Sequence, residues 1–299
     1  MTEHKITPDL ELKIEFIKFY YTLWNRITHP SPRVIIDTHT GTGIYEYTEN
    51  NNSKKGYNSG ILAILKTVML SNKLTIILNE GSKQKYEKIC EEIDKIETEG
   101  IPIFETNPKK TFQKNLINSR KKKIRKRIKR LFPEKIDENP PFGYIRVNRK
   151  TKAKIVCKNY NIEENIDQIF KSYFKDVTIT KKDKTKKTFQ VKGIFLVSSN
   201  DPKEWNLIDK IGEKAKDNGS IELIFVYSSP HIFINLKGYI SNLKKYFDEV
   251  KILKSSQSQE EQFTCLFFCS NNPIGVSLAD NRIKNMQEKI KYMDIREYL

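Results

Sequence analysis

The first apolar pattern in the chain has helical spacing. Residues 8–28 begin with a proline, which suits a first helical turn, and the apolar side chains that follow recur three or four positions apart: Leu12, Phe16, Phe19, Tyr20, Leu23 and Ile27. The spacing predicts an amphipathic helix that packs one face on a core. His29, Pro30 and Pro32 predict where it ends.

Short apolar runs then alternate with helical patterns. The expected order is a strand at 34–37, a polar loop at 47–59, a helix at 60–70, a strand at 74–80, a helix at 82–97 and a strand at 101–106. The alternation resumes with a strand at 193–201, a helix at 205–217, a strand at 221–229, a helix at 240–247, strands at 249–255 and 263–270, and a terminal helix. This order predicts an α/β fold with a sheet of about seven mostly parallel strands whose faces are covered by helices.

The alternation is interrupted by a strongly basic segment. Residues 109–192 hold 27 lysines and arginines against 8 acidic residues, a net charge of +19 in a chain whose total is +17. We therefore predict a basic α+β insertion at 109–192, between the third and fourth strands. The predicted core is 1–108 together with 193–299.

The insertion carries signs of folded structure. Residues 109–130 hold twelve basic side chains and no acid, with apolar residues at helical spacing, and two later segments, 142–160 and 177–191, each resemble two strands around a polar turn. A cationic helix is typical of phosphate binding, although such charge also keeps proteins soluble or binds anionic membranes. We expect nucleic acid, RNA or DNA, to contact Lys121, Lys122, Lys123, Arg125, Lys126, Arg127, Lys129 and Arg130.

Composition argues against a membrane protein, an exported protein and a metal site. No apolar stretch reaches the length of a membrane span, and the charged N-terminus lacks the apolar run of a signal peptide, so we expect a cytoplasmic protein with no membrane association. The four cysteines lack the paired short spacings of a zinc ribbon. We expect buried thiols and no metal site.

The strand at 34–37 leads into a glycine turn, DTHTGTG. Gly41 and Gly43 let the backbone turn tightly and approach a ligand closely. A dinucleotide fingerprint would place a third small residue where this chain has Glu46, which argues against NAD. Glu80 closes the next strand, where a carboxylate can accept hydrogen bonds from both ribose hydroxyls of an adenosine ligand.

Together these residues resemble the class I methyltransferases, which bind S-adenosylmethionine. More narrowly, the chain is similar to the three-Cys-motif partner family, which has a T-P-x-x-x-K helix, a D-x-F-A-G-P-G turn, a G-S-P-L-x-A helix, a D-P strand end and an F-A-(S/T)-x-x-P-x-G stretch. The matching residues here are Thr7, Pro8 and Lys13; Asp37, Gly41 and Gly43; Ser59 and Ala63; Asp201 and Pro202; and Ser270, Pro273 and Gly275. The resemblance implies a Rossmann-like methyltransferase fold and adds a possible three-Cys-motif protein as partner.

The turn also resembles the D-T-H-x-G-x-G-x-Y stretch of ribosomal-RNA adenine N6 methyltransferases of the RlmJ type. Both resemblances imply the same fold and cofactor. They imply that S-adenosylmethionine contacts Asp37, Thr38, Gly41, Gly43, Glu80 and Asn107. Of these, Asn107 follows the expected third strand and would lie near the adenine.

The end of the fourth strand departs from the pattern of amino-methyltransferases. They carry D/N/S-P-P-Y/F/W there, whereas this chain has Asn200, Asp201 and Pro202 followed by Lys203, Glu204 and Trp205. We take Asn200, Asp201 and Pro202 as the catalytic candidates for methyl transfer to nucleic acid. The missing second proline leaves an alternative open, a methyltransferase fold that has lost catalysis and serves as a binding module or partner subunit.

Overall fold

The structure is a computed structural model of the 299-residue chain. It describes residues 8–28, 31–49, 52–58, 60, 74–99, 144–146, 154–180, 185–197, 204–229, 232–256 and 263–290. All structural statements below concern these residues. The strand expected at 101–106, the cationic helix at 109–130 and the segment 198–203 lie outside them.

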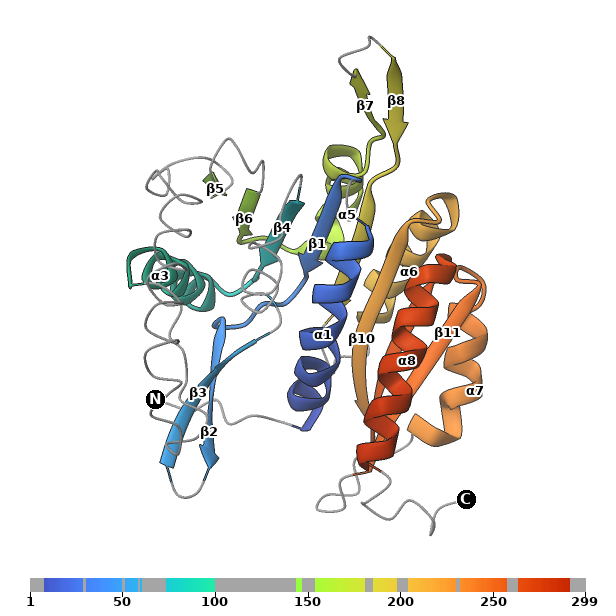
Figure 1. Cartoon of the computed structure of the whole chain (residues 1–299). Coiled ribbons are helices and arrows are strands. Elements are labelled where there is room, and N and C mark those ends of the chain that lie inside the picture. The colour runs from blue at the N-terminus through green and yellow to red at the C-terminus, as the bar shows by residue number, and fades with distance from the viewer. Residues whose placement is uncertain are drawn as a thin grey trace, which may run out of the picture.

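The described chain is built on one eight-stranded sheet in the order β11-β12-β10-β9-β1-β4-β6-β5 (Figure 1). Its strands are β1 (Arg33–Asp37), β4 (Leu74–Asn79), β5 (Tyr144–Arg146), β6 (Lys154–Lys158), β9 (Lys192–Val197), β10 (Ile221–Ser229), β11 (Glu249–Ser256) and β12 (Phe263–Ser270). The five strands from β6 to β10 are parallel, and β12 runs antiparallel to both of its neighbours.

This arrangement is the class I methyltransferase fold. Counted along the chain, the seven strands other than β5 lie in the order 3-2-1-4-5-7-6, with the seventh antiparallel. The predicted α/β fold class is therefore confirmed. The chain order reverses beside β1, whose neighbours are β4 on one side and β9 on the other, and open α/β sheets bind ligands at the carboxyl ends of strands at such a reversal.

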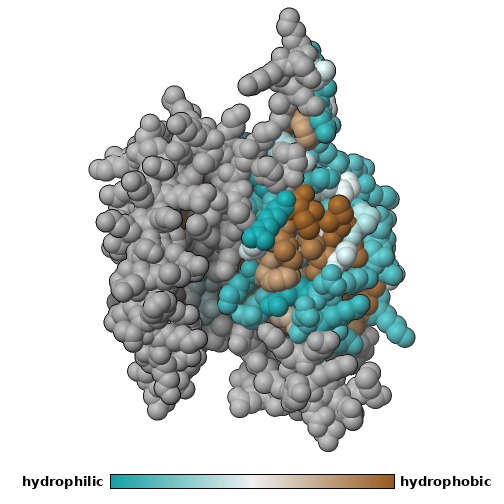
Figure 2. Space-filling view, viewed as in Figure 1, coloured by the Kyte–Doolittle hydropathy of each residue, from teal (hydrophilic) through white to brown (hydrophobic). Residues whose placement is uncertain are grey.

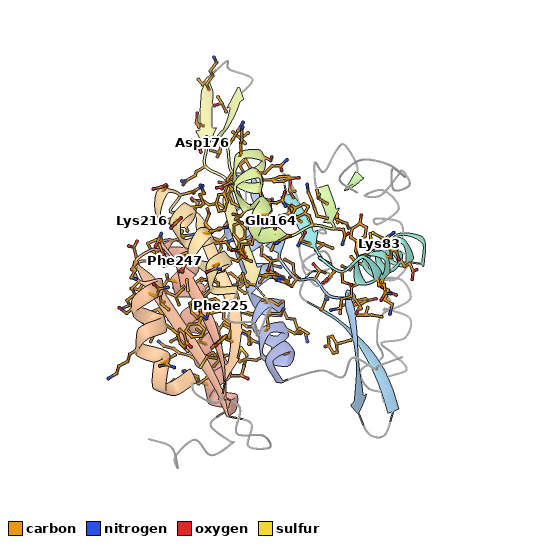
Figure 3. All side chains as sticks on the ribbon, turned by 180° about the vertical axis from the view of Figure 1, so that it is seen from behind. Lys83, Glu164, Asp176, Lys216, Phe225 and Phe247 are labelled. Carbon is orange, nitrogen blue, oxygen red and sulfur yellow. The ribbon has the colours of Figure 1, made fainter. Side chains whose placement is uncertain are left out.

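Helices cover both faces of the sheet (Figure 1). One apolar cluster joins the sheet to α1 (Pro8–Ile27), α3 (Lys83–Glu99) and α8 (Pro273–Ile290). The other joins it to α5 (Ile162–Tyr173), α6 (Glu204–Asp217) and α7 (Ile232–Leu243). Seen from behind in Figure 3, Phe225 and Phe247 point into this second cluster, whereas Lys83, Glu164 and Lys216 point outward.

The main sheet and its covering helices include part of the segment predicted as the basic insertion. The strand beside β4 is β6, paired in parallel register from Thr75 with Lys154 to Asn79 with Lys158, and α5 buries Ile162, Ile166 and Ile169 in the core. Residues 154–173 therefore belong to the sheet and its covering layer. Sequence reasoning missed this because lysines flank the short apolar run of β6 on both sides.

Three hairpins accompany the sheet. The two expected in the basic segment are present: β5 pairs with β6, and β7 (Val177–Thr180) pairs with β8 (Lys186–Phe189). The third contradicts the polar loop expected at 47–59, because β2 (Ile44–Glu49) and β3 (Asn52–Tyr57) pair antiparallel directly after the glycine turn. In Figure 1 the β2–β3 and β7–β8 hairpins extend from opposite ends of the sheet.

The predicted N-terminal helix is confirmed, with a small change of face. Phe16, Tyr20 and Trp24 are buried, whereas Phe19 and Ile27, expected on the buried side, are 41% and 44% exposed. Figure 2 shows apolar atoms gathered on this side of the molecule, where α1 and α8 pack together. Within the described residues, no helix is both long enough and apolar enough to cross a bilayer.

Candidate functional site

The site is built around the turn that follows β1. Gly41 and Gly43 have φ angles of 67° and 83°, a backbone region that favours glycine, which confirms the predicted tight turn. A Cβ at Gly41 would have Asn58 Nδ2, at 3.6 Å, as its nearest neighbour. Among the described residues, no atom comes closer to this position than ordinary van der Waals contact, as a cradle for a ligand requires.

Glu80 closes this turn from the neighbouring strand. One carboxylate oxygen accepts a hydrogen bond from the Gly41 amide at 2.8 Å, and the other accepts one from the Ser82 amide at 3.0 Å. Glu80 is only 6% exposed. Because each carboxylate oxygen has two lone pairs, both retain capacity for a further donor, such as a ribose hydroxyl.

Two asparagine side chains fix the carbonyl groups of the turn. Asn79 Nδ2 donates to Thr38 O at 3.0 Å and to Tyr160 O at 3.2 Å, which ties the carboxyl ends of β1, β4 and β6 together. Asn58 Nδ2 donates to Thr40 O. Both asparagines are buried, and sequence reasoning missed them because asparagine at a strand end is most often an ordinary turn residue.

Thr38 joins the turn to His39 and to the end of β9. Its buried hydroxyl lies 3.0 Å from Leu196 O, to which it can donate, and 2.8 Å from His39 Nδ1. The hydroxyl has a single hydrogen, so the donor in the contact with His39 depends on the tautomer of the ring. Thr38 N also donates to Leu196 O, so the turn is anchored to the end of β9.

Gly60 packs directly beneath the turn. A Cβ at this position would lie 2.7 Å from Leu78 Cδ2, 2.8 Å from Thr40 Cγ2 and 3.0 Å from Asp37 Oδ2. These distances are too short for a side chain to be accommodated without displacement of the turn. The close approach explains why this position has a glycine.

Asp37 lies at the buried carboxyl end of β1 and is fully inaccessible to solvent. Tyr21 of α1, which is also fully buried, lies close enough for an electrostatic interaction with Asp37. Burial, and secondarily the Asp37 carboxylate, raise the pKa of Tyr21 well above its ordinary value. The phenol therefore stays neutral beside Asp37, and α1 closes the site from below.

The end of β6 completes the rim. Asn159 Nδ2 donates to Glu80 O at 2.7 Å and to Gly81 O at 3.1 Å. The Lys158 ammonium lies 5.2 Å from the centre of the Tyr160 ring, and burial lowers the pKa of Lys158 to about 8. Asn107, which is predicted to contact adenine, lies outside the described residues; among the described residues, Asn159 directly follows β6, the strand beside β4.

The structure thus brings Asp37, Thr38, Gly41, Gly43 and Glu80 together at one edge of the sheet. The remaining predicted residues lie outside the described part of the chain. They are Asn107, the catalytic candidates Asn200, Asp201 and Pro202, and the eight basic residues of segment 121–130. Among the described residues, no cluster of histidine, cysteine and acidic side chains could hold a metal ion.

Comparison with known proteins adds a structural likeness. No family model and no curated protein matches the sequence. Protein LPL1258 from Legionella pneumophila, of family DUF519, superposes with a TM-score of 0.53 at 10% identity, over 93% of this chain and 91% of that one. This likeness shows that the two chains share a fold.

Two methyltransferases superpose more weakly. The METTL16 MTase domain gives a TM-score of 0.38 at 11% identity, over 84% of this chain and 66% of that one. A human methyltransferase 10 domain containing protein gives a TM-score of 0.38 at 8% identity, over 86% of this chain and 82% of that one.

Proposed function

We propose that this protein binds S-adenosylmethionine at the glycine turn and transfers its methyl group to nucleic acid. The observation that carries the proposal is the hydrogen bond from the Gly41 amide to Glu80. It places a buried carboxylate against a glycine turn, at the strand-order reversal of a class I methyltransferase sheet. Turn, carboxylate and fold are the three features that an adenosyl cofactor needs together.

The described residues fit that cofactor. Glu80 offers acceptor positions for the ribose hydroxyls, and the open side of Gly41 allows the ligand close to the backbone. Asp37 either orients the amino group of the methionine portion or organises the turn. Asn159, at the end of β6, stands where the adenine edge would come. The cofactor itself supplies an activated methyl group on a sulfonium.

The protein's part in catalysis is mainly positioning. An attacking atom must be held about 3–3.5 Å from the methyl carbon and in line with the bond that breaks. The predicted residues for this task are Asn200, Asp201 and Pro202, which follow β9 by a few positions. Val197, the last residue of β9, lies one register step beyond the Asp37–Leu196 pair, and these residues follow it in the sequence.

The basic segment supports nucleic acid as the substrate. A net charge of +19 within residues 109–192 favours phosphate binding, which is strongly salt-sensitive. Neutralising Lys121, Lys122 and Lys123 together should remove about three phosphate contacts. The affinity for nucleic acid should then depend less steeply on the salt concentration, and the affinity for the cofactor should not change. The resemblance to the three-Cys-motif partner family adds a protein partner as a further expectation.

Transfer of a labelled methyl group tests the function. Purified protein is incubated with methyl-labelled S-adenosylmethionine and either total RNA or DNA, in parallel with Asp201→Ala and with Glu249→Ala, which changes an acid at the far side of the sheet. We expect label in one nucleic acid for the wild type and Glu249→Ala, and at least a hundredfold loss for Asp201→Ala.

One sequence observation favours a second candidate, a cofactor-binding module without catalysis. The stretch NDPKEW lacks the second proline of amino-methyltransferases. In that case the wild type would bind both cofactor and nucleic acid, yet transfer no label to either RNA or DNA.

A further inference from the structure

The β7–β8 hairpin is an exposed arm at the amino ends of the parallel strands, whereas the glycine turn lies at their carboxyl ends. Within the described part of the chain the two strands pair only with each other, and β8 leads through Gln190 and Val191 into Lys192, the first residue of β9. Lys192 N donates to Pro32 O just before β1, which places the base of the arm at the amino ends of the parallel strands. Figure 1 shows the arm projecting beyond the sheet there.

The arm contributes little to the core. Val177, Thr178, Lys186, Lys187 and Thr188 are all exposed. A two-stranded hairpin without a covered face is marginally stable by itself, so its retention as a projecting element calls for a partner that it contacts. Lysines along an exposed strand disfavour pairing with a strand of another chain, which argues against a second protein copy as that partner.

The chemistry of the arm suits a phosphate backbone. Residues 175–187 contain six lysines and two aspartates, a net charge of +4. Among the described ones, Lys186 and Lys187 are adjacent on β8, and Lys175 precedes β7. The Lys187 ammonium lies 5.0 Å from the centre of the Phe189 ring, and the Thr178 and Thr188 hydroxyls lie 3.1 Å apart across the hairpin. Hydroxyls and ammonium groups on one exposed ribbon are typical phosphate contacts.

Lysines continue from the arm onto α5. A surface hollow is lined by Asp167, Gln168, Lys171, Ser172 and Lys175. Asp167 is paired with Lys214 of α6 at 2.8 Å, so its negative charge is already compensated. In Figure 3, Asp176 lies at the base of the arm, above Glu164 on α5. The lysines of this surface therefore outnumber its unpaired acids.

The position of the arm sets a length scale. Residues 186–197 run from the outer part of β8 to the carboxyl end of β9, beside the glycine turn. At about 3.3 Å per residue, this extended path spans up to roughly 36 Å. A nucleic acid that touches both the arm and a target nucleotide at the turn must bridge on the order of 30 Å. At about 3.4 Å per base pair, that is close to one turn of a double helix.

We propose that the β7–β8 hairpin is a second nucleic-acid contact and that the substrate carries a double-helical stem of about ten base pairs or more beside its target nucleotide. This inference rests on the proposed function, since it takes the target nucleotide to lie at the glycine turn. It adds the class of substrate: a folded, stem-bearing nucleic acid rather than a free nucleotide or a short single strand.

Stem length provides the test. Fluorescent hairpins with the same loop and stems of 6 or 14 base pairs are titrated by anisotropy, each as RNA and as DNA, at several salt concentrations. The variant is Lys186→Glu with Lys187→Glu. The matched control is Lys244→Glu with Lys245→Glu, an equally exposed adjacent pair after α7. Calorimetry with S-adenosylhomocysteine and a thermal melt accompany each protein.

For the wild type we expect at least tenfold tighter binding of the 14-pair stem in one of the two nucleic acids. In the arm variant this advantage disappears and the salt slope falls by about two, while affinity for the 6-pair stem and for S-adenosylhomocysteine is unchanged. The control pair should keep the full preference for the long stem.

Other results overturn the inference in recognisable ways. If the arm variant keeps the long-stem preference, the hairpin is not a nucleic-acid contact, whatever the fate of the proposed function. If the wild type sediments as a dimer that the arm variant abolishes, the hairpin pairs protein copies instead. If the wild type binds S-adenosylhomocysteine but neither nucleic acid, both the arm and the nucleic-acid substrate are wrong and the cofactor site stands.

Discussion

The Gly41 amide donates a hydrogen bond of 2.8 Å to the carboxylate of Glu80, across 39 residues of sequence. This contact joins the turn after β1 to the end of β4. Since the other carboxylate oxygen holds the Ser82 amide, Glu80 organises the rim of the site before any ligand arrives. It therefore has two tasks, one structural and one in binding.

The two tasks of Glu80 can be separated by two variants. Glu80→Ala removes every acceptor, and we expect S-adenosylhomocysteine to bind about 10–100-fold more weakly, as loss of 1.5–3 kcal/mol of charge-assisted hydrogen bonding implies. Glu80→Gln keeps one carbonyl acceptor and should lose less. Calorimetric titration measures both. Equal affinity for the wild type and Glu80→Ala would remove Glu80 from the binding site.

The side chain of Asn79 should contribute more to the free energy of unfolding than the side chain of an exposed asparagine. Asn79→Ala leaves the buried carbonyl of Thr38 and the part-buried carbonyl of Tyr160 without this donor, so we expect the free energy of unfolding to fall by about 1–3 kcal/mol. Asn165→Ala is the control, because Asn165 donates to Asn161 O at an exposed site, and it should stay within about 0.5 kcal/mol of the wild type. Urea denaturation compares them, and equal effects would contradict the role assigned to Asn79.

Two glycines should respond to alanine with opposite signs. Gly60→Ala forces a methyl group to within 3.0 Å of three side chains around the turn, and we expect a loss of about 1–3 kcal/mol together with weaker cofactor binding. Gly238 lies inside α7, and no neighbouring atom of the described residues is within 4 Å of an added Cβ. Gly238→Ala should therefore stabilise the protein by about 0.5–1 kcal/mol. Thermal unfolding tests both, and destabilisation by Gly238→Ala would show that α7 is packed differently.

Glu222 gives stability a pH dependence. Burial raises the pKa of this fully buried carboxyl to about 8, although Tyr20, which donates to it at 2.6 Å, Asn272 and Lys192 partly oppose the rise. Between the ordinary value of 4.5 and about 8, the folded protein binds more protons than the unfolded chain. The contribution of Glu222 is thus fully present at low pH and is lost as pH rises through 8.

The loss should be on the order of 4 kcal/mol between pH 5 and pH 9, beyond what other groups contribute. Glu222→Gln keeps an acceptor for Tyr20 and removes the ionisable group, so its stability should vary less over the same range. Denaturation at several pH values checks this. A wild type and a Glu222→Gln variant with parallel pH profiles would show that Glu222 titrates normally.

The sequence was sufficient to predict the strands whose apolar runs are long and uninterrupted, such as β1, β4 and β10, and the turn that Gly41 and Gly43 require. It predicted β6 as part of a hairpin but did not reveal that β6 pairs with β4 in the main sheet, because three buried residues between lysines resemble a surface hairpin. The partner of β6 in the sheet is decided by tertiary packing, which local pattern does not encode.

Within the site, too, local sequence predicts some residues, and only the folded chain reveals the others. Glu80 could be found because an acid at the end of the second strand has a known chemical use. Asn58 and Asn79 could not, since their importance comes from carbonyl groups of the turn that only the folded chain brings to them. The contacts of Asn200 and Asp201 stay predictions that the methyl-transfer experiment addresses.

The most direct measurement is calorimetric titration of the purified wild type and Gly43→Val with S-adenosylmethionine. A side chain at φ 83° is strained, and it would disturb the turn at the point where the ligand is expected. We predict one-to-one binding by the wild type and its loss in a Gly43→Val protein that remains folded. A folded wild type that binds no S-adenosylmethionine would show that the glycine turn is not a site for this cofactor.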